Sequence, residues 1–144
     1  MQLFVIDMRL DDVSVLVVDD DPDTRHLLAT VLSLRGASVL TASSASEALR
    51  TITRSPPDVI VSDVGMPGQD GYELMRAVRA QPPERGGTIP AVAVTAFGGR
   101  EHRVRALAAG FHTYLIKPVE PSELTWVVKM LAERRNLDEL DWTA

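Results

Sequence analysis

Several charged and hydroxyl side chains of this chain stand directly after runs of aliphatic residues. Asp63 follows the run Val-Ile-Val at 59–61 and precedes a loop that contains glycine and proline. Asp19 and Asp20 follow a first apolar stretch, and Thr95 and Lys117 end two later ones. Continuous aliphatic runs are typical of strands in a parallel sheet that is buried on both faces. Because open α/β sheets place their chemistry at the carboxyl ends of the strands, we expect these side chains to converge.

The chemistry that these side chains could perform is cation binding and phosphoryl transfer. Three carboxylates at one edge of a sheet repel one another unless a cation neutralises them. No histidine or cysteine stands beside them, and an all-oxygen ligand set favours Mg²⁺, or alternatively Mn²⁺. Lys117 offers a mobile positive charge for a phosphate, and Thr95 adds a hydroxyl donor. Since a carboxylate can form an aspartyl phosphate, we expect Asp63 to accept a phosphoryl group.

An alternation of strands and helices must position these residues. Apolar stretches predict strands over 13–18, 38–41, 59–63, 90–95 and 112–117. Asp21 before a proline is typical of a helix start, and we expect Leu27 and Leu28 on the inward face of that helix. Ser44 and Asp70, each three residues before a glutamate, indicate the starts of two further helices. The pattern predicts an α/β fold, a doubly wound five-stranded parallel sheet with helices on both faces.

The length of 144 residues is typical of a single domain. We expect this domain to span 13–135, after an N-terminal extension or linker over 1–12 and before an acidic C-terminal tail over 136–144. Residues 3–6 could form a short extra strand, but the charged residues at 7, 9, 11 and 12 favour a solvated lead-in. The last helix is expected to begin at Pro121 and to end near Arg135.

Composition and charge exclude several functions. The formal net charge is −5 and no run of Lys or Arg occurs, so direct nucleic-acid binding is not expected. The chain has no cysteine, which excludes disulfides and thiolate metal sites and fits a reducing compartment. Residues 1–9 are too short and too charged for a signal peptide or a membrane span. We therefore expect a cytoplasmic protein that does not enter a membrane.

Five short motifs, in order, resemble the receiver domain family of two-component response regulators. They are Val-Val-Asp-Asp at 17–20, Ser-Asp-Val-Gly-Met-Pro at 62–67, Asp-Gly at 70–71, Val-Thr-Ala at 94–96 and Ile-Lys-Pro at 116–118. The resemblance covers 13–135 and implies a flavodoxin-like strand order of 2-1-3-4-5. The Gly-Met-Pro-Gly loop at 65–68 and the long loop at 82–87 also resemble receivers attached to hybrid sensor kinases.

This resemblance implies roles for the residues singled out above. Asp63 would take a phosphoryl group from a phosphohistidine of a sensor histidine kinase or a histidine phosphotransfer domain. Asp20 and Asp63 would ligate Mg²⁺, with Asp19 acting through water. The backbone carbonyl of Gly65 would supply another ligand. Thr95 and Lys117 would hold the phosphoryl oxygens, and the peptide bond after Lys117 would be cis, which would position the lysine.

The resemblance also implies a switch. Tyr114 occupies the position of the family's switch aromatic, three residues before Lys117. On phosphorylation, Thr95 would move toward the new oxygens and Tyr114 would turn into the space behind it, altering the surface of the fourth helix, fifth strand and fifth helix. Gly65 and Phe97 depart from the commonest family residues. By the resemblance, both would flank the path of a hydrolytic water, which bears on the lifetime of the phosphorylated state.

The last helix also carries large apolar residues away from its inward face. Trp126 and Met130 lie four residues apart, on a different side from Leu124 and Val128. They either form a surface for an unidentified output partner or for a homodimer through the fourth helix, fifth strand and fifth helix, or they widen the core stripe.

Two other functions remain open from the sequence. A haloacid-dehalogenase-like phosphatase would use Asp19 as its nucleophile in an Asp-x-Asp-x-Thr pattern, but Asp23 stands where the threonine belongs. A pseudo-receiver used only for docking would need no acceptor, yet every acid needed for the chemistry is present. Phosphate-loop, zinc-protease and nucleophile-elbow motifs are absent. We therefore expect no enzyme activity beyond the domain's own phosphorylation and dephosphorylation.

Overall fold

The computed structural model describes residues 7–66 and 68–141, in which five strands alternate with five α-helices. The expected strand over 3–6 lies outside the described residues. The elements are β1 (Ser14–Val18), α1 (Pro22–Leu34), β2 (Ser38–Ala42), α2 (Ala45–Arg54), β3 (Val59–Asp63), α3 (Gly71–Arg79), the short 3₁₀ helix η1 (Pro83–Arg85), β4 (Ala91–Thr95), α4 (Arg100–Ala109), β5 (Thr113–Ile116) and α5 (Pro121–Asp141).

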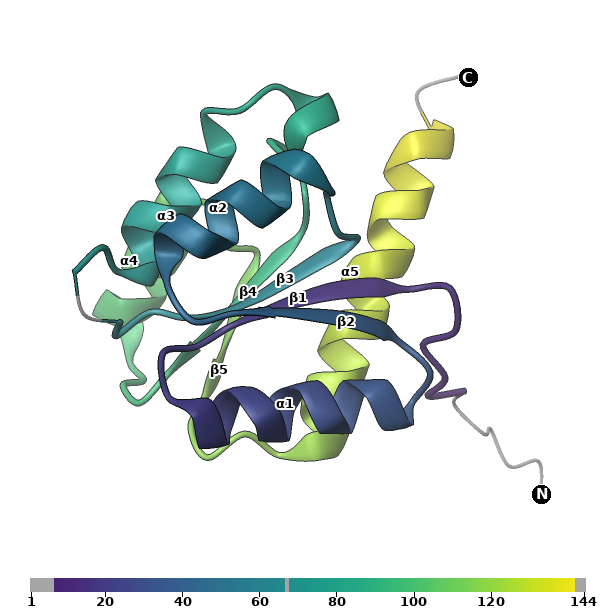
Figure 1. Cartoon of the computed structure of the whole chain (residues 1–144), viewed down its shortest axis with the longest axis horizontal. Coiled ribbons are helices and arrows are strands. Elements are labelled where there is room, and N and C mark those ends of the chain that lie inside the picture. Colours follow the sequence, from purple (N-terminus) through teal and green to yellow (C-terminus); the bar gives the residue numbers. More distant parts are fainter. Residues whose placement is uncertain (1–6, 67, 142–144) are drawn as a thin grey trace.

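The strands form one parallel sheet in the order β2-β1-β3-β4-β5, which confirms the predicted flavodoxin-like order. Helices α1 and α5 cover one face of the sheet, and α2, α3 and α4 cover the other (Figure 1). In the register of the sheet, Val18 pairs with Ser62 and Asp63 pairs with Val94. The carboxyl ends of the central strands therefore lie side by side at one edge.

Burial on both faces of the sheet explains the unbroken aliphatic runs. All residues of β3 and β4 are buried. Along β1, Leu16 and Val18 join the apolar cluster under α2, α3 and α4, whereas Val15 and Val17 join the cluster under α1 and α5. Because successive side chains of a strand point to opposite faces, a strand covered on both sides needs an apolar residue at every position.

Side-chain caps define the helix starts nearest the site, as the sequence predicts. The Asp21 carboxylate accepts a hydrogen bond from the Thr24 amide at 3.2 Å, and Ser44 caps α2. Asp70 and Glu73 form a reciprocal capping box at the start of α3. These caps begin α1 and α3 shortly after β1 and β3, so the loops that carry the acidic residues are short and anchored at both ends.

The segment before β1 packs against the core of the domain instead of extending into solvent. Leu10 is fully buried in the cluster under α1 and α5, and its amide donates to the Arg35 carbonyl oxygen at 2.7 Å. The Lys129 Nζ of α5 donates to the Arg9 carbonyl oxygen at 2.9 Å. The expectation of a solvated lead-in is therefore wrong for Leu10. Because charged residues flank Leu10 in the sequence, its burial could not be predicted from the local pattern.

Two helices also differ from the predictions. Leu27 was expected on the inward face of α1, but 58% of it is exposed. Helix α5 continues to Asp141 rather than ending near Arg135, because its last residues include helix-forming Leu and Glu and no glycine or proline. Within the described residues, no helix has the length and apolar character needed to cross a membrane.

Candidate functional site

The predicted site residues meet at the edge formed by the carboxyl ends of the strands. Asp63 is the last residue of β3, Thr95 is the last residue of β4, and Asp19 directly follows β1. Asp19 and Thr95 are buried, and Asp63 is only 7% exposed, whereas Asp20 is exposed to solvent. Asp19 and Asp63 therefore lie inside the protein surface, and Asp20 lies at its rim.

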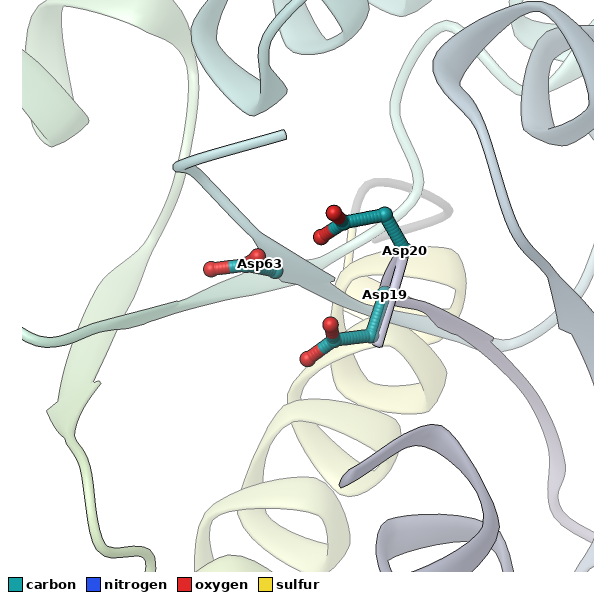
Figure 2. Close-up of side chains that lie close together, drawn as sticks. All are labelled: Asp19, Asp20 and Asp63. Carbon is teal, nitrogen blue, oxygen red and sulfur yellow. The ribbon is translucent and has the colours of Figure 1, made fainter. Parts of the chain in front are cut away.

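The three aspartates are close enough to share one ion. Each offers one carboxylate oxygen, and these oxygens all lie within 4.8 Å of one another. Figure 2 shows the three carboxylates extending into the same space from the end of β1 and the end of β3. Hard oxygen donors in such a cluster fit Mg²⁺ or Mn²⁺, so the donor chemistry of Asp19, Asp20 and Asp63 agrees with the expected metal site.

Lys117 brings a positive charge to this cluster. Its Nζ lies 3.3 Å from Asp19 Oδ2 and 3.3 Å from Asp63 Oδ1. Partial burial alone lowers the pKa of Lys117, but the charges of Asp63 and Asp19 outweigh that effect and raise the pKa above its ordinary value of 10.5. The lysine is therefore charged at neutral pH. The peptide bond between Lys117 and Pro118 is cis, as the resemblance implied.

Asp19 is the most strongly enclosed of the three carboxylates. Burial raises the pKa of Asp19, and the charge of Asp63 raises it further. A hydrogen bond from the Asp21 amide at 2.9 Å and the charge of Lys117 oppose this rise without cancelling it. Burial thus makes the charge of Asp19 costly, and a bound cation would reduce this cost.

A pocket of about 220 Å³ opens beside Asp63. Residues of three strand ends and their loops line it: Asp63, Val64, Gly65, Thr95, Ala96, Phe97 and Lys117. The Gly65 amide donates to Asp63 Oδ1 at 3.3 Å, and the Phe97 amide donates to Thr95 Oγ1 at 3.0 Å. The pocket therefore exposes a carboxylate, a hydroxyl and an ammonium group to one small volume.

Two contacts that support the site escaped the sequence analysis. A Cβ at Gly71 would collide with the Asp63 carbonyl oxygen and lie 2.7 Å from Val64 Cα, so only glycine lets α3 start this close to β3. The Asp-Gly pair at 70–71 was the available signal. The Arg25 guanidinium of α1 donates to the Asp19 carbonyl oxygen at 2.9 Å, and no local pattern marks that arginine.

The remaining predicted residues lie on β5 and α5. Tyr114 is partly buried and packs against the apolar cluster under α2, α3 and α4. Trp126 is 41% exposed and Met130 is 44% exposed, and neither belongs to the two apolar core clusters. Their exposure favours the interpretation that they form a binding surface over the alternative that they broaden the buried apolar face of α5.

Fold and pocket together define a class of protein. It is a doubly wound α/β domain in which a carboxylate, Asp63, ends a central strand. That carboxylate belongs to a cluster of three acids able to hold a cation, and a lysine lies beside it. The profile of the response regulator receiver domain family matches residues 15–129, and the chain belongs to this family. Domains of this family are signalling modules of two-component systems rather than conventional enzymes.

Relatives by sequence include proteins of different size. The chain is 49% identical over 120 residues to the 14.6 kDa protein in the sodA1 3′ region of Leptolyngbya boryana, covering 83% of this chain and 90% of that one. It is 39% identical to the sensor histidine kinase RcsC of Salmonella typhi, covering 86% of this chain but 13% of the kinase. With the transcriptional regulatory protein PrrA of Mycobacterium tuberculosis it shares 41% identity, covering 84% of this chain and 50% of that protein.

Solved structures share the same fold. The chemotaxis response regulator CheY4 of Vibrio cholerae is similar with a TM-score of 0.77 and 32% identity, covering 83% of this chain and 98% of that one. The receiver domain of the Francisella response regulator 1452 is similar with a TM-score of 0.78 and 31% identity, covering 86% of this chain and 99% of that one.

Proposed function

We propose that this receiver domain is a phosphorylation-dependent switch in which Asp63 accepts a phosphoryl group. The donor is the phosphohistidine of a sensor histidine kinase or of a histidine phosphotransfer domain. The observation that carries this proposal is the position of Lys117 Nζ, 3.3 Å from both Asp63 Oδ1 and Asp19 Oδ2. A phosphoryl group on Asp63 brings negative oxygens next to that ammonium group, which is suited to stabilise them.

The transfer exchanges one bond to phosphorus for another. A carboxylate oxygen of Asp63 attacks the phosphorus, and the bond from phosphorus to the donor imidazole nitrogen breaks with its electron pair left on that nitrogen. Lys117 and the Thr95 hydroxyl hold phosphoryl oxygens. Phosphoryl transfer depends mainly on positioning and charge neutralisation, and the pocket beside Asp63, called the acceptor pocket below, offers both.

The acidic cluster would hold the cation that this chemistry needs. Asp20 and Asp63 are proposed as direct carboxylate ligands of Mg²⁺, or of Mn²⁺. The Gly65 backbone carbonyl is proposed as a further ligand, and Asp19 is proposed to act through bound water. The cation, when bound, neutralises charge on the phosphoryl oxygens. The close approach of the three carboxylates supports this assignment.

Phosphorylation is proposed to act on the rest of the domain through Thr95 and Tyr114. Thr95 Oγ1 accepts a hydrogen bond from the Phe97 amide at 3.0 Å. Movement of this hydroxyl toward the phosphoryl oxygens would free space behind it, into which Tyr114 turns. The surface of α4, β5 and α5 changes as a result, because one local charge shifts the balance between two packings.

Exposed apolar side chains on β5 and α5 are proposed to contribute to the output site. Ile116 on β5 is 47% exposed, and Trp126 and Met130 on α5 are exposed to a similar degree. Large apolar side chains on a surface are typical of interfaces. We propose that a partner protein, or a second copy of the chain, binds there.

The donor is proposed to dock on a groove next to Lys117. This groove has a volume of about 400 Å³ and is lined by α1, the segment after β5 and the start of α5: Thr24, Leu27, Leu28, Val31, Lys117, Pro118, Val119, Pro121 and Leu124. Its lining is mostly apolar, and Lys117 links it to the acceptor pocket. An apolar helix face of the donor protein seated there would bring its phosphohistidine toward Asp63.

Leu27→Glu is expected to slow transfer from a phosphohistidine donor by about tenfold or more, because it places a charge in an apolar contact. Loading by acetyl phosphate, which needs no protein contact, should stay unchanged. The measurement compares both reactions, using a phosphorylated histidine phosphotransfer domain that loads the wild-type chain. Leu34→Glu is the matched control, since Leu34 is 78% exposed on the same helix and does not line the groove. Equal slowing by both variants would argue against docking in this groove.

The direct test of the proposed function is incubation of the wild-type chain with acetyl phosphate and Mg²⁺, read by intact mass. We expect the mass to rise by one phosphoryl group, and we expect no such gain when EDTA is present from the start and removes the metal. No gain would favour the pseudo-receiver. Steady hydrolysis of p-nitrophenyl phosphate would favour the phosphatase with Asp19 as nucleophile, which the family assignment does not support.

A further inference from the structure

Phe97 is the largest side chain among the residues that line the acceptor pocket, yet the core does not hold it in place. The residue is 64% exposed and lies in the loop between β4 and α4. Gly65 also lines this pocket and has no side chain to narrow it; a Cβ there would lie 4.0 Å from Asp63 Oδ1. The position of the Phe97 ring therefore determines how far the acceptor pocket is open to solvent.

His102 is the residue that holds this ring. The imidazole of His102 stacks on the phenyl ring of Phe97, with centroids 5.5 Å apart and planes 21° from parallel. Four residues, Gly98, Gly99, Arg100 and Glu101, separate the two aromatic residues, and Gly99 adopts a φ of +105°. No side chain caps the start of α4. Because the two glycines carry no side chains that could fix the loop, the ring stack is a contact that ties Phe97 to the first turn of α4.

We propose that His102 is a positioning residue that keeps Phe97 over the acceptor pocket and so slows hydrolysis of the aspartyl phosphate. The inference rests on the proposed function, since it concerns the lifetime of the group on Asp63. In this hydrolysis a water oxygen attacks phosphorus, the bond from phosphorus to the Asp63 oxygen breaks, and inorganic phosphate and the free carboxylate leave with the water proton released to solvent. An aromatic ring fixed at the opening excludes water from that approach.

The expected effect follows from the strength of an aromatic pair. Loss of such a stack changes the population of the ordered loop by about two- to tenfold. We therefore expect His102→Ala and Phe97→Ala each to shorten the lifetime of the phosphorylated domain by a factor in this range. The double variant should decay no faster than Phe97→Ala alone, because both changes remove the same shield. His102→Tyr keeps an aromatic partner and should keep the slow decay.

The experiment loads each variant with acetyl phosphate and Mg²⁺, removes the donor by desalting, and follows loss of the phosphoryl group by intact mass. His26→Ala, a histidine exposed on α1, is the matched control, and thermal unfolding verifies that each variant is folded. The proposal is overturned if His102→Ala loses its phosphoryl group at the wild-type rate, whatever the rate for Phe97→Ala. It is also overturned if the effects of the two changes on this rate are additive. Failure of the wild type to load at all would instead remove the proposed function.

Discussion

Asp63→Asn should gain no phosphoryl group from acetyl phosphate under conditions in which the wild-type chain gains one. The amide of asparagine has nearly the shape of the carboxylate but cannot act as the nucleophile that forms an acyl phosphate. Asp63 is also the carboxylate that lines the acceptor pocket with Thr95 and Lys117. Loss of loading is expected to be complete, measured by intact mass after incubation with Mg²⁺.

The control for this result is Asp23→Asn, because Asp23 is an exposed aspartate of α1 outside the acidic cluster. It should load like the wild type. Loading of Asp63→Asn to the wild-type level would mean that another carboxylate, such as Asp19 or Asp20, is the acceptor. Peptide mapping of the loaded wild type distinguishes these acceptors.

Asp19→Asn should stabilise the metal-free domain while weakening its binding of Mg²⁺. Burial raises the pKa of Asp19, so the ionised carboxylate destabilises the folded state relative to the protonated one. Asparagine removes that charge and keeps an oxygen for the Asp21 amide. Lys117 retains its ion pair with Asp63 at 3.3 Å. We expect the unfolding free energy at neutral pH with EDTA to rise on the order of 1 kcal/mol.

The same change should reduce Mg²⁺ affinity by about ten- to hundredfold, the effect typical of residues that act on a metal through an outer shell. Calorimetric titration measures the affinity, and urea unfolding with and without Mg²⁺ measures stability. Asp20→Asn separates the two effects: it should also weaken Mg²⁺ binding, but its exposed side chain should leave metal-free stability within about 0.5 kcal/mol. Destabilisation of the metal-free domain by Asp19→Asn would contradict the buried-charge explanation.

The raised pKa values of Asp19 and Lys117 determine how the unfolding free energy of the domain changes with pH. Because the pKa of Asp19 is raised in the folded domain, its contribution to metal-free stability falls as pH rises above the ordinary carboxyl value of 3.8. The raised pKa of Lys117 gives a contribution that is complete below 10.5 and is lost as pH rises through its higher folded value. Asp19→Asn should therefore flatten the acidic side of the stability profile. It should also reduce the loss of stability on the alkaline side, because the charge of Asp19 helps to raise the pKa of Lys117.

The sequence alone was sufficient for the alternating fold and for most of the acceptor site. Strands buried on both faces require an apolar residue at every position, so the aliphatic runs and the polar residues that end them are visible locally. The caps at Asp21 and Asp70 are equally local, because a capping side chain reaches only the first turn of its own helix. Asp19, Asp63, Thr95 and Lys117 could be singled out for this reason.

Only the tertiary structure decided which side chains from distant parts of the chain touch. Lys117 lies between Asp19 and Asp63 because the sheet order brings three strand ends together. Leu10 is buried in one cluster with residues of α1 and α5, whereas Leu27 of α1 lies outside that cluster and is exposed. Such contacts depend on where separate elements cross, and the spacing of residues along one element carries no information about that crossing.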